Sequence, residues 1–180
     1  MLYDYSNSIK KFNNHYNLNK AIEKGQIYKI DRGIYSDNKN VSELDIISFK
    51  YSNAIFTKDS AYFYLGFTNY APDKYYLATP KDAYKIKDKR IIQIFCKNNQ
   101  FNFGTTEIIY ENTKIKVYNK ERMLVELVRN KNKCPYDYYK EIINNYRNIK
   151  NELNISNIIN YAKYYANSNN IIKTLQLEVF

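Results

Sequence analysis

The sequence has 180 residues, with 28 lysines and arginines against 18 aspartates and glutamates, which gives a formal charge of +10. One domain, or one domain with a small appendage, is expected at this length, and 44% hydrophobic residues exclude a disordered chain. Because no apolar run approaches the roughly 20 residues of a membrane helix and the first residues lack a signal peptide, we expect a cytoplasmic protein without a membrane partner.

The first forty residues predict a small unit of helices and short strands. Residues 5–14 have helical composition. A second short helix is predicted by apolar residues at i, i+3 and i+4 spacing, namely Leu18, Ala21 and Ile22. Asn17 is its predicted cap, and Gly25 its predicted C-terminal stop.

Two short strands follow, over residues 26–30 and 33–36, joined by the turn Asp31-Arg32-Gly33, in which Gly33 favours a positive φ. The order helix, glycine, strand, basic turn, strand is that of the closing half of a winged helix-turn-helix. We therefore predict a winged-helix DNA-binding unit over residues 1–40, with a boundary in the polar segment 36–40.

Residues 41–180 predict a second domain with a mixed sheet and C-terminal helices. A helix is expected over 42–51, and a short strand followed by a helix over 55–66, capped by Asp59 or Ser60. Further strands are predicted over 75–79, 83–86, 90–96, 107–110 and 114–118, the last two as a hairpin.

Helical spacing of apolar residues recurs four times after residue 119, around Leu124, Ile142, Ile158 and Leu175, with Asn119 and then Asn154 or Ser156 as candidate caps. The predicted fold class is α+β: a short N-terminal winged helix-turn-helix followed by a mixed β-sheet domain packed with a C-terminal helical bundle.

Residues that carry catalytic chemistry are sparse. The single histidine, His15, has no second metal ligand nearby, and the four glycines stand too far apart for a phosphate-binding loop. Glu107, Glu111 and Lys114 are faintly similar to the two acids and lysine of metal-dependent nucleases, but a solvated hairpin is the favoured interpretation. We expect neither an enzyme nor a cofactor or metal.

Basic and amide side chains of the first forty residues are placed as in a DNA-binding unit. Two asparagines at the start of the second helix sit where recognition helices reach base edges, and the lysines and arginine suit phosphates. The predicted nucleic-acid-binding residues are Asn17, Asn19, Lys20, Lys24, Lys29, Arg32, Lys10 and Lys11.

A compositional explanation of the basic charge stands beside this hypothesis. Asparagine, isoleucine, lysine and tyrosine make up 93 of the 180 residues, and all four have A/T-rich codons. A lysine-rich surface that reflects genome composition is therefore the alternative to a nucleic-acid footprint. For the tyrosines, core packing is favoured over a base-stacking platform.

Three motifs follow one another at residues 20–35, 54–69 and 114–129. Their matching residues are Gly25, Ile27, Arg32, Gly33 and Tyr35, then Ser60, Ala61, Leu65, Gly66 and Thr68, then Glu121, Arg122 and Leu124, with Phe67 and Met123 departing from the pattern. In this order the chain from about residue 18 to its end resembles the AbiEi family, the antitoxins of type IV toxin–antitoxin (abortive infection) systems.

This resemblance implies a winged helix that binds repeats in its own promoter and represses transcription. It also implies a C-terminal domain that is needed for antitoxicity and for cooperative binding of further copies on DNA. The implied toxin is a nucleotidyltransferase, countered without a stable complex. Since only 17 residues precede Leu18, we expect an abbreviated helix-turn-helix. The alternative is a protein-interaction module whose C-terminal helices bind a toxin or a second copy.

Overall fold

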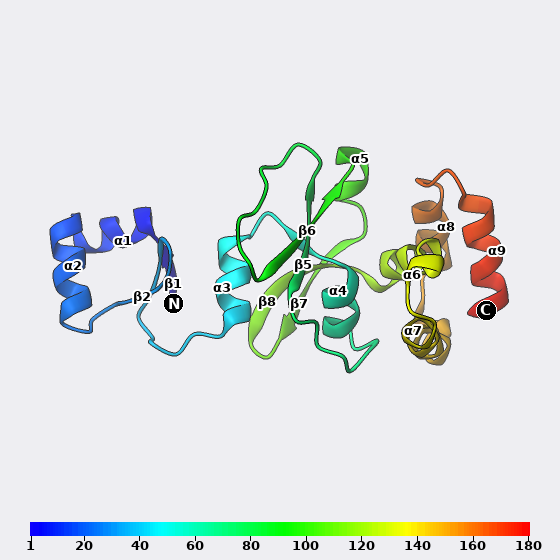
Figure 1. Cartoon of the computed structure of the whole chain (residues 1–180), viewed down its shortest axis with the longest axis horizontal. Coiled ribbons are helices and arrows are strands. Elements are labelled where there is room, and N and C mark those ends of the chain that lie inside the picture. The colour runs from blue at the N-terminus through cyan, green and yellow to red at the C-terminus, as the bar shows by residue number, and fades with distance from the viewer. The chain divides into compact units, whose positions relative to one another are not determined.

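The computed structural model describes residues 1–180, with nine α-helices and two β-sheets (Figure 1). The helices are α1 (Tyr5–Phe12), α2 (His15–Glu23), α3 (Glu43–Lys50), α4 (Lys58–Tyr64), α5 (Asn98–Phe101), α6 (Lys120–Arg129), α7 (Tyr136–Asn148), α8 (Ile155–Ala162) and α9 (Ser168–Glu178). The strands are β1 (Leu2–Asp4), β2 (Tyr28–Asp31), β3 (Ile34–Ser36), β4 (Ile55–Phe56), β5 (Tyr75–Pro80), β6 (Ile91–Cys96), β7 (Thr105–Tyr110) and β8 (Thr113–Tyr118). The predicted α+β class is confirmed.

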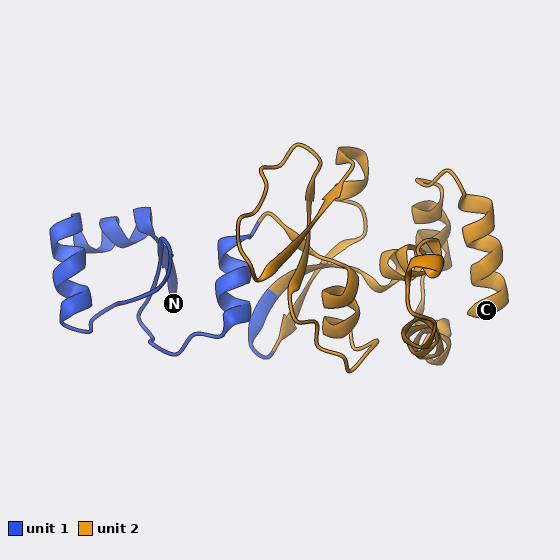
Figure 2. Ribbon diagram, viewed as in Figure 1, with its two compact units in different colours: residues 1–52, 111–114 blue, residues 53–110, 115–180 orange.

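The chain divides into two compact units (Figure 2). The first unit contains residues 1–52 and 111–114, and the second contains residues 53–110 and 115–180. The domain boundary that the sequence places near residue 40 stays a prediction. None of the helices combines the length and the apolarity that crossing a bilayer requires.

The first unit is built on a three-stranded antiparallel sheet in the order β1-β3-β2. Strand β1 was not predicted, because its three residues form a strand only through pairing with β3. The core beneath the sheet contains Leu18, Ala21, Ile27 and Tyr35, with half-buried apolar side chains of α1 and β1 packed against it. Tyr35 thus packs the β2–β3 hairpin against the helices.

The second sheet has the order β6-β5-β4-β8-β7. Strand β4 pairs antiparallel with β5 and parallel with β8, while β5 and β6 run parallel. The strand predicted over 83–86 is wrong: this segment is part of the loop that joins β5 to β6. The main-chain N–H of Ile86 donates to the side chain of Gln93 instead of a strand, and Tyr84 is 97% exposed.

Strands β7 and β8 form the predicted hairpin. Its two central residues are Glu111 and Asn112, with φ of 46° and 70°, which matches a two-residue turn with both centres in the left-handed region. Ile115 and Val117 are buried on β8, whereas Lys114 is exposed. Side chains along this strand therefore alternate between the core and the opposite face.

Helices α6, α8 and α9 pack against one another, and α6 also contacts α4. Asn119 caps α6 by accepting a hydrogen bond from the main-chain N–H of Arg122 at 2.9 Å, and Asn154 caps α8 in the same way. The caps predicted for α4 are wrong, because the helix follows Thr57 directly. Ser60 is instead buried, and its hydroxyl accepts the main-chain N–H of Tyr76.

Arg122 connects α6 to the loop before β7. Its side chain is 1% exposed, and Nη1 donates to the main-chain oxygens of Gln100 at 2.5 Å and Phe103 at 2.7 Å. The guanidinium also lies over the rings of Phe103 and Tyr118, at 4.1 and 3.6 Å from their centroids. Buried cations require such partners, so Arg122 acts as a structural bridge between α6 and this loop.

Candidate nucleic-acid interface

Helix α2 lies between two well-defined ends. Asn13 has a positive φ of 69°, which reverses the chain after α1 and is tolerated by asparagine. The side chain of Asn14 then accepts the main-chain N–H of Asn17 at 2.8 Å. The predicted cap, Asn17, is therefore wrong: α2 begins two residues earlier, and the side chain of Asn17 does not cap it.

The end of α2 is a Schellman motif. Gly25, with φ of 67°, donates its N–H to the oxygen of Ile22, and the N–H of Gln26 reaches the oxygen of Ala21. This closure turns the chain sharply, so that Ile27 is fully buried immediately before β2. The stop predicted at Gly25 is confirmed.

The outward face of α2 carries the predicted reading residues. Leu18 and Ala21 are buried, and the opposite side of the helix is exposed, with the side chains of Tyr16, Asn17, Asn19, Lys20 and Lys24. Lys20 and Lys24 share a face, as their spacing predicts. The Nζ of Lys20 lies 4.4 Å from the ring centroid of Tyr16, while the Asn19 amide approaches His15 Nδ1 at 3.3 Å.

Tyr16 is the residue that the sequence reasoning missed. Its side chain is 64% exposed, although its ring is large and mostly apolar. The sequence did contain a signal for this exposure. At 100° per residue, Tyr16 lies on the side of the helix away from Leu18 and next to Lys20, which follows it by four residues. The wrong position assigned to the cap concealed this signal, since it placed Tyr16 before the helix.

The turn between β2 and β3 presents Arg32 beside Gly33, which has φ of 73°. Lys29 and Arg32 are both exposed. Asp31 accepts the main-chain N–H of Arg32 at 2.6 Å and pairs with Lys50 of α3 at 3.0 Å. Arg32 also lines a surface cavity of about 730 Å³ to which Lys50 contributes, so the turn lies next to α3.

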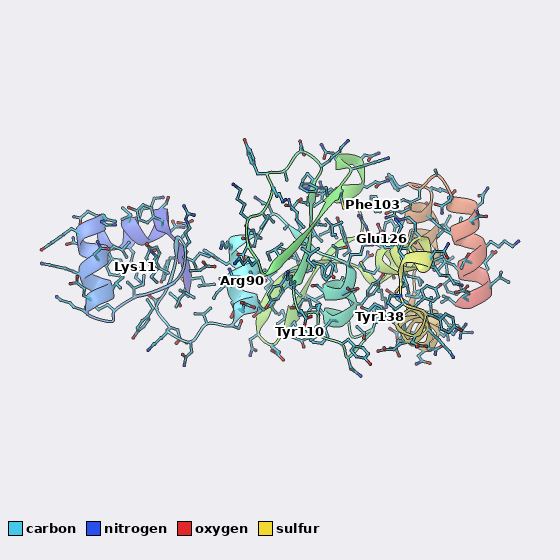
Figure 3. The ribbon with its side chains drawn as sticks, in the orientation of Figure 1. Lys11, Arg90, Phe103, Tyr110, Glu126 and Tyr138 are labelled. Carbon is cyan, nitrogen blue, oxygen red and sulfur yellow. The ribbon has the colours of Figure 1, made fainter.

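Helix α1 contributes two lysines with different surroundings. Lys10 is exposed. Lys11, marked in Figure 3, pairs with Asp37 at 2.6 Å and donates to the Tyr3 hydroxyl at 2.9 Å. Hydrogen bonds to Asp37 and then to Tyr3 raise the pKa of Lys11, and its ammonium lowers the pKa of Asp37. Lys11 is therefore already engaged within the unit.

Most of the acidic side chains in the first forty residues already form a hydrogen bond or an ion pair within the protein. Asp4 caps α1 by accepting the main-chain N–H of Asn7 at 2.7 Å, Asp31 pairs with Lys50, and Asp37 pairs with Lys11. Six exposed cations have no acidic partner within hydrogen-bonding or ion-pair distance, namely Lys10, Lys20, Lys24, Lys29, Arg32 and Lys39. The surface of this unit therefore carries uncompensated positive charge, which attracts polyanions.

The second unit holds the remaining candidates for chemistry. Glu107 lies on β7, Glu111 in the hairpin turn and Lys114 on β8, and nowhere do three or more His, Cys, Asp or Glu side chains gather as metal ligands. A cavity of about 910 Å³ has walls from Tyr62 and Tyr138. Their hydroxyls already bond the main-chain oxygen of Met123 and the carboxylate of Asp59.

Comparison with known proteins adds no relative: no protein-family model matches the chain, and no curated protein matches it.

Proposed function

We propose that this chain is a DNA-binding transcriptional autorepressor that acts as the antitoxin of a type IV toxin–antitoxin module. The observation that carries the proposal is the exposed surface of α2, where asparagine and lysine side chains lie outside the buried stripe of Leu18 and Ala21. Uncompensated cations on neighbouring elements extend this surface, and such cations bind DNA phosphates.

The order β1-α1-α2-β2-β3 supports a winged helix-turn-helix as the reading unit. In this interpretation α1 and α2 are the two helices of the helix-turn-helix, and the β2–β3 hairpin is the wing. Helix α2 then enters the major groove with its N-terminal residues on base edges. Asn17 and Asn19 are assigned to the bases, whereas Lys20, Lys24, Lys29 and Arg32 are assigned to phosphate and groove contacts and Lys10 to the flanking backbone.

The antitoxin part of the proposal rests on the resemblance to the AbiEi family. The matching motifs occupy positions with a structural role in this fold: Gly25, Gly33 and Gly66 have positive φ, and Tyr35 and Arg122 are buried. The partner is then a nucleotidyltransferase toxin, opposed without a stable complex. Coexpression with the toxin should restore growth, whereas copurification at a fixed ratio would favour a protein-interaction module instead.

The DNA-binding proposal is tested by fluorescence anisotropy. The full-length protein is titrated onto a duplex from upstream of its own gene and onto a scrambled duplex, across a salt series. We expect tighter binding to the upstream duplex and a negative slope of log K against log salt concentration.

Lys24→Ala and Arg32→Ala should each weaken binding to both duplexes and reduce the slope by about 1. Lys173→Ala is the matched control, because it removes an exposed lysine from α9 in the other unit. Equal, weak binding of the wild type to both duplexes, or unchanged affinity in both α2 and wing variants, would refute the proposal.

A further inference from the structure

An exposed aromatic ring lies at the centre of the outward face of α2. At 100° per residue, Tyr16 and Lys20 project directly away from the buried stripe of Leu18 and Ala21, with Asn17 and Asn19 on either side of them. Tyr16 remains 64% exposed, and the ammonium of Lys20 at 4.4 Å holds its ring on the helix surface. A ring in this position is covered only when something docks on α2.

The side chains around Tyr16 match one kind of base pair. Asparagine binds the N6 and N7 edge of adenine, while apolar groups contact the methyl group of thymine. Arginine and lysine are the usual readers of guanine; α2 contains no arginine, and the ammonium of its one lysine, Lys20, lies over the ring of Tyr16. The helix therefore offers two amides for adenine and one ring for thymine.

The composition of the chain supplies an independent indication. Asparagine, isoleucine, lysine and tyrosine account for 93 of its 180 residues, and their codons are rich in A and T. This codon usage indicates an A·T-rich gene, and we expect the DNA around the gene to be A·T-rich as well. The major groove of such DNA carries closely spaced thymine methyl groups.

Resting on the proposed function, we propose that α2 reads A·T base pairs and that the ring of Tyr16 packs against the C5-methyl group of thymine. Lys20 orients the ring, and the amides of Asn17 and Asn19 set the register on neighbouring adenines. This contact selects sequence, whereas the phosphate contacts of Lys24 and Arg32 do not.

Uracil substitution tests the contact directly, because uracil lacks only the methyl group. The wild type is titrated by anisotropy onto the upstream duplex and onto the same duplex with uracil in place of thymine. Losing one buried methyl group should weaken wild-type binding about fourfold. Tyr16→Ala should bind both duplexes equally, whereas Tyr16→Phe should keep the fourfold difference. Tyr84→Ala, which removes a 97% exposed tyrosine from the β5–β6 loop, is the control and should behave as the wild type.

The outcomes separate this inference from the function on which it rests. If Tyr16→Ala discriminates thymine from uracil as the wild type does, or if the wild type does not discriminate, the role of Tyr16 is refuted while DNA binding stands. If the wild type does not prefer its upstream duplex over a scrambled one, both the inference and the proposed function fail.

Discussion

At Gly104, a positive φ of 65° coincides with a close approach to α6. A Cβ built there would lie 2.8 Å from the Cβ of Arg122, an atom that moves only with the helix backbone. Gly66 also has a positive φ, 77°, but has nothing within 4 Å of such a Cβ. An alanine at Gly66 would therefore introduce backbone strain alone, whereas an alanine at Gly104 would introduce both backbone strain and a steric clash.

We predict that Gly104→Ala lowers the free energy of unfolding by about 1–3 kcal/mol more than Gly66→Ala does. Gly66→Ala carries only the strain of a left-handed alanine, whereas Gly104→Ala also displaces the buried Arg122. Urea unfolding midpoints of the two variants measure the difference. Equal midpoints would show that Arg122 moves aside freely.

Glu126, marked in Figure 3, is a buried carboxylate with four side-chain partners, one of which is the Asn130 amide that donates to it at 3.2 Å. Burial opposes its ionisation, but Arg129 at 2.8 Å, the Tyr165 hydroxyl at 2.5 Å and Arg122 at 3.8 Å outweigh burial and lower its pKa. Because the folded pKa lies below the unfolded value, the stabilisation is present above the unfolded pKa and is lost as pH falls through the folded one.

We therefore expect the free energy of unfolding to decrease as the pH falls below about 4.5, the ordinary pKa of glutamate. Glu126→Gln should flatten this decrease, while Glu111→Gln, an exposed glutamate in the hairpin turn, should leave it unchanged. Denaturant unfolding at pH 3 to 7 provides the measurement. An unaltered pH dependence in Glu126→Gln would contradict the assignment.

At the scale of one element, Asn14 caps α2, whereas Asn17 lies within the helix and is the asparagine that we propose to contact DNA. Asn14→Ala removes the side-chain acceptor of the helix cap and should cost about 1 kcal/mol. Asn17→Ala places a better helix former inside α2 and should leave stability unchanged or slightly higher. Thermal unfolding measures both effects. If Asn17→Ala lost as much stability as Asn14→Ala, the assignment of the helix cap to Asn14 would be wrong.

The order of the two effects should be reversed in DNA binding, where Asn17→Ala is the more damaging variant. Asn17→Ala should weaken binding to the upstream duplex without affecting folding, because its side chain faces outward. Asn14→Ala should affect binding only through the stability of the helix. Anisotropy at a temperature where both variants are folded makes the comparison.

Elements with strong local signals could be predicted from the sequence. The stop at Gly25, the cap at Asn119 and the β7–β8 hairpin depend on residues next to each other in the chain, and local chemistry determines them. Strand β1 and the loop at 83–86 were mispredicted because pairing with distant strands decides them. All eight polar residues of the candidate site are exposed. The exposure of Tyr16 was missed because the cap was placed at Asn17, and the pairing of Lys11 with Asp37 could not be predicted because the two residues lie 26 positions apart in sequence.

At the scale of the whole molecule, the two units differ in the size of their cores. A small unit buries a lower fraction of its surface and has a lower free energy of unfolding. Leu18 is fully buried at the centre of the first unit, and Leu18→Ala should cost about 2–5 kcal/mol, which is comparable to the whole stability of so small a unit.

We predict that Leu18→Ala removes amide hydrogen-exchange protection from α1, α2 and β2 while β5 and α6 keep theirs. Leu124→Ala, at a fully buried position in α6, is the reciprocal control and should reduce protection in the second unit. A loss of protection throughout the chain in both variants would mean that the two units unfold as one.

The β5–β6 connection has a practical consequence. Residues 81–90 join two parallel strands without a helix or a strand of their own, and they include exposed lysines at 81, 85, 87 and 89. Trypsin should cleave the native chain there first, since exposed loops are preferred sites of nicking. The two fragments share a sheet, so the nicked protein should hold together. The loop is therefore a place to insert a reporter peptide that follows the protein in cells while leaving α2 and the β2–β3 hairpin unaltered.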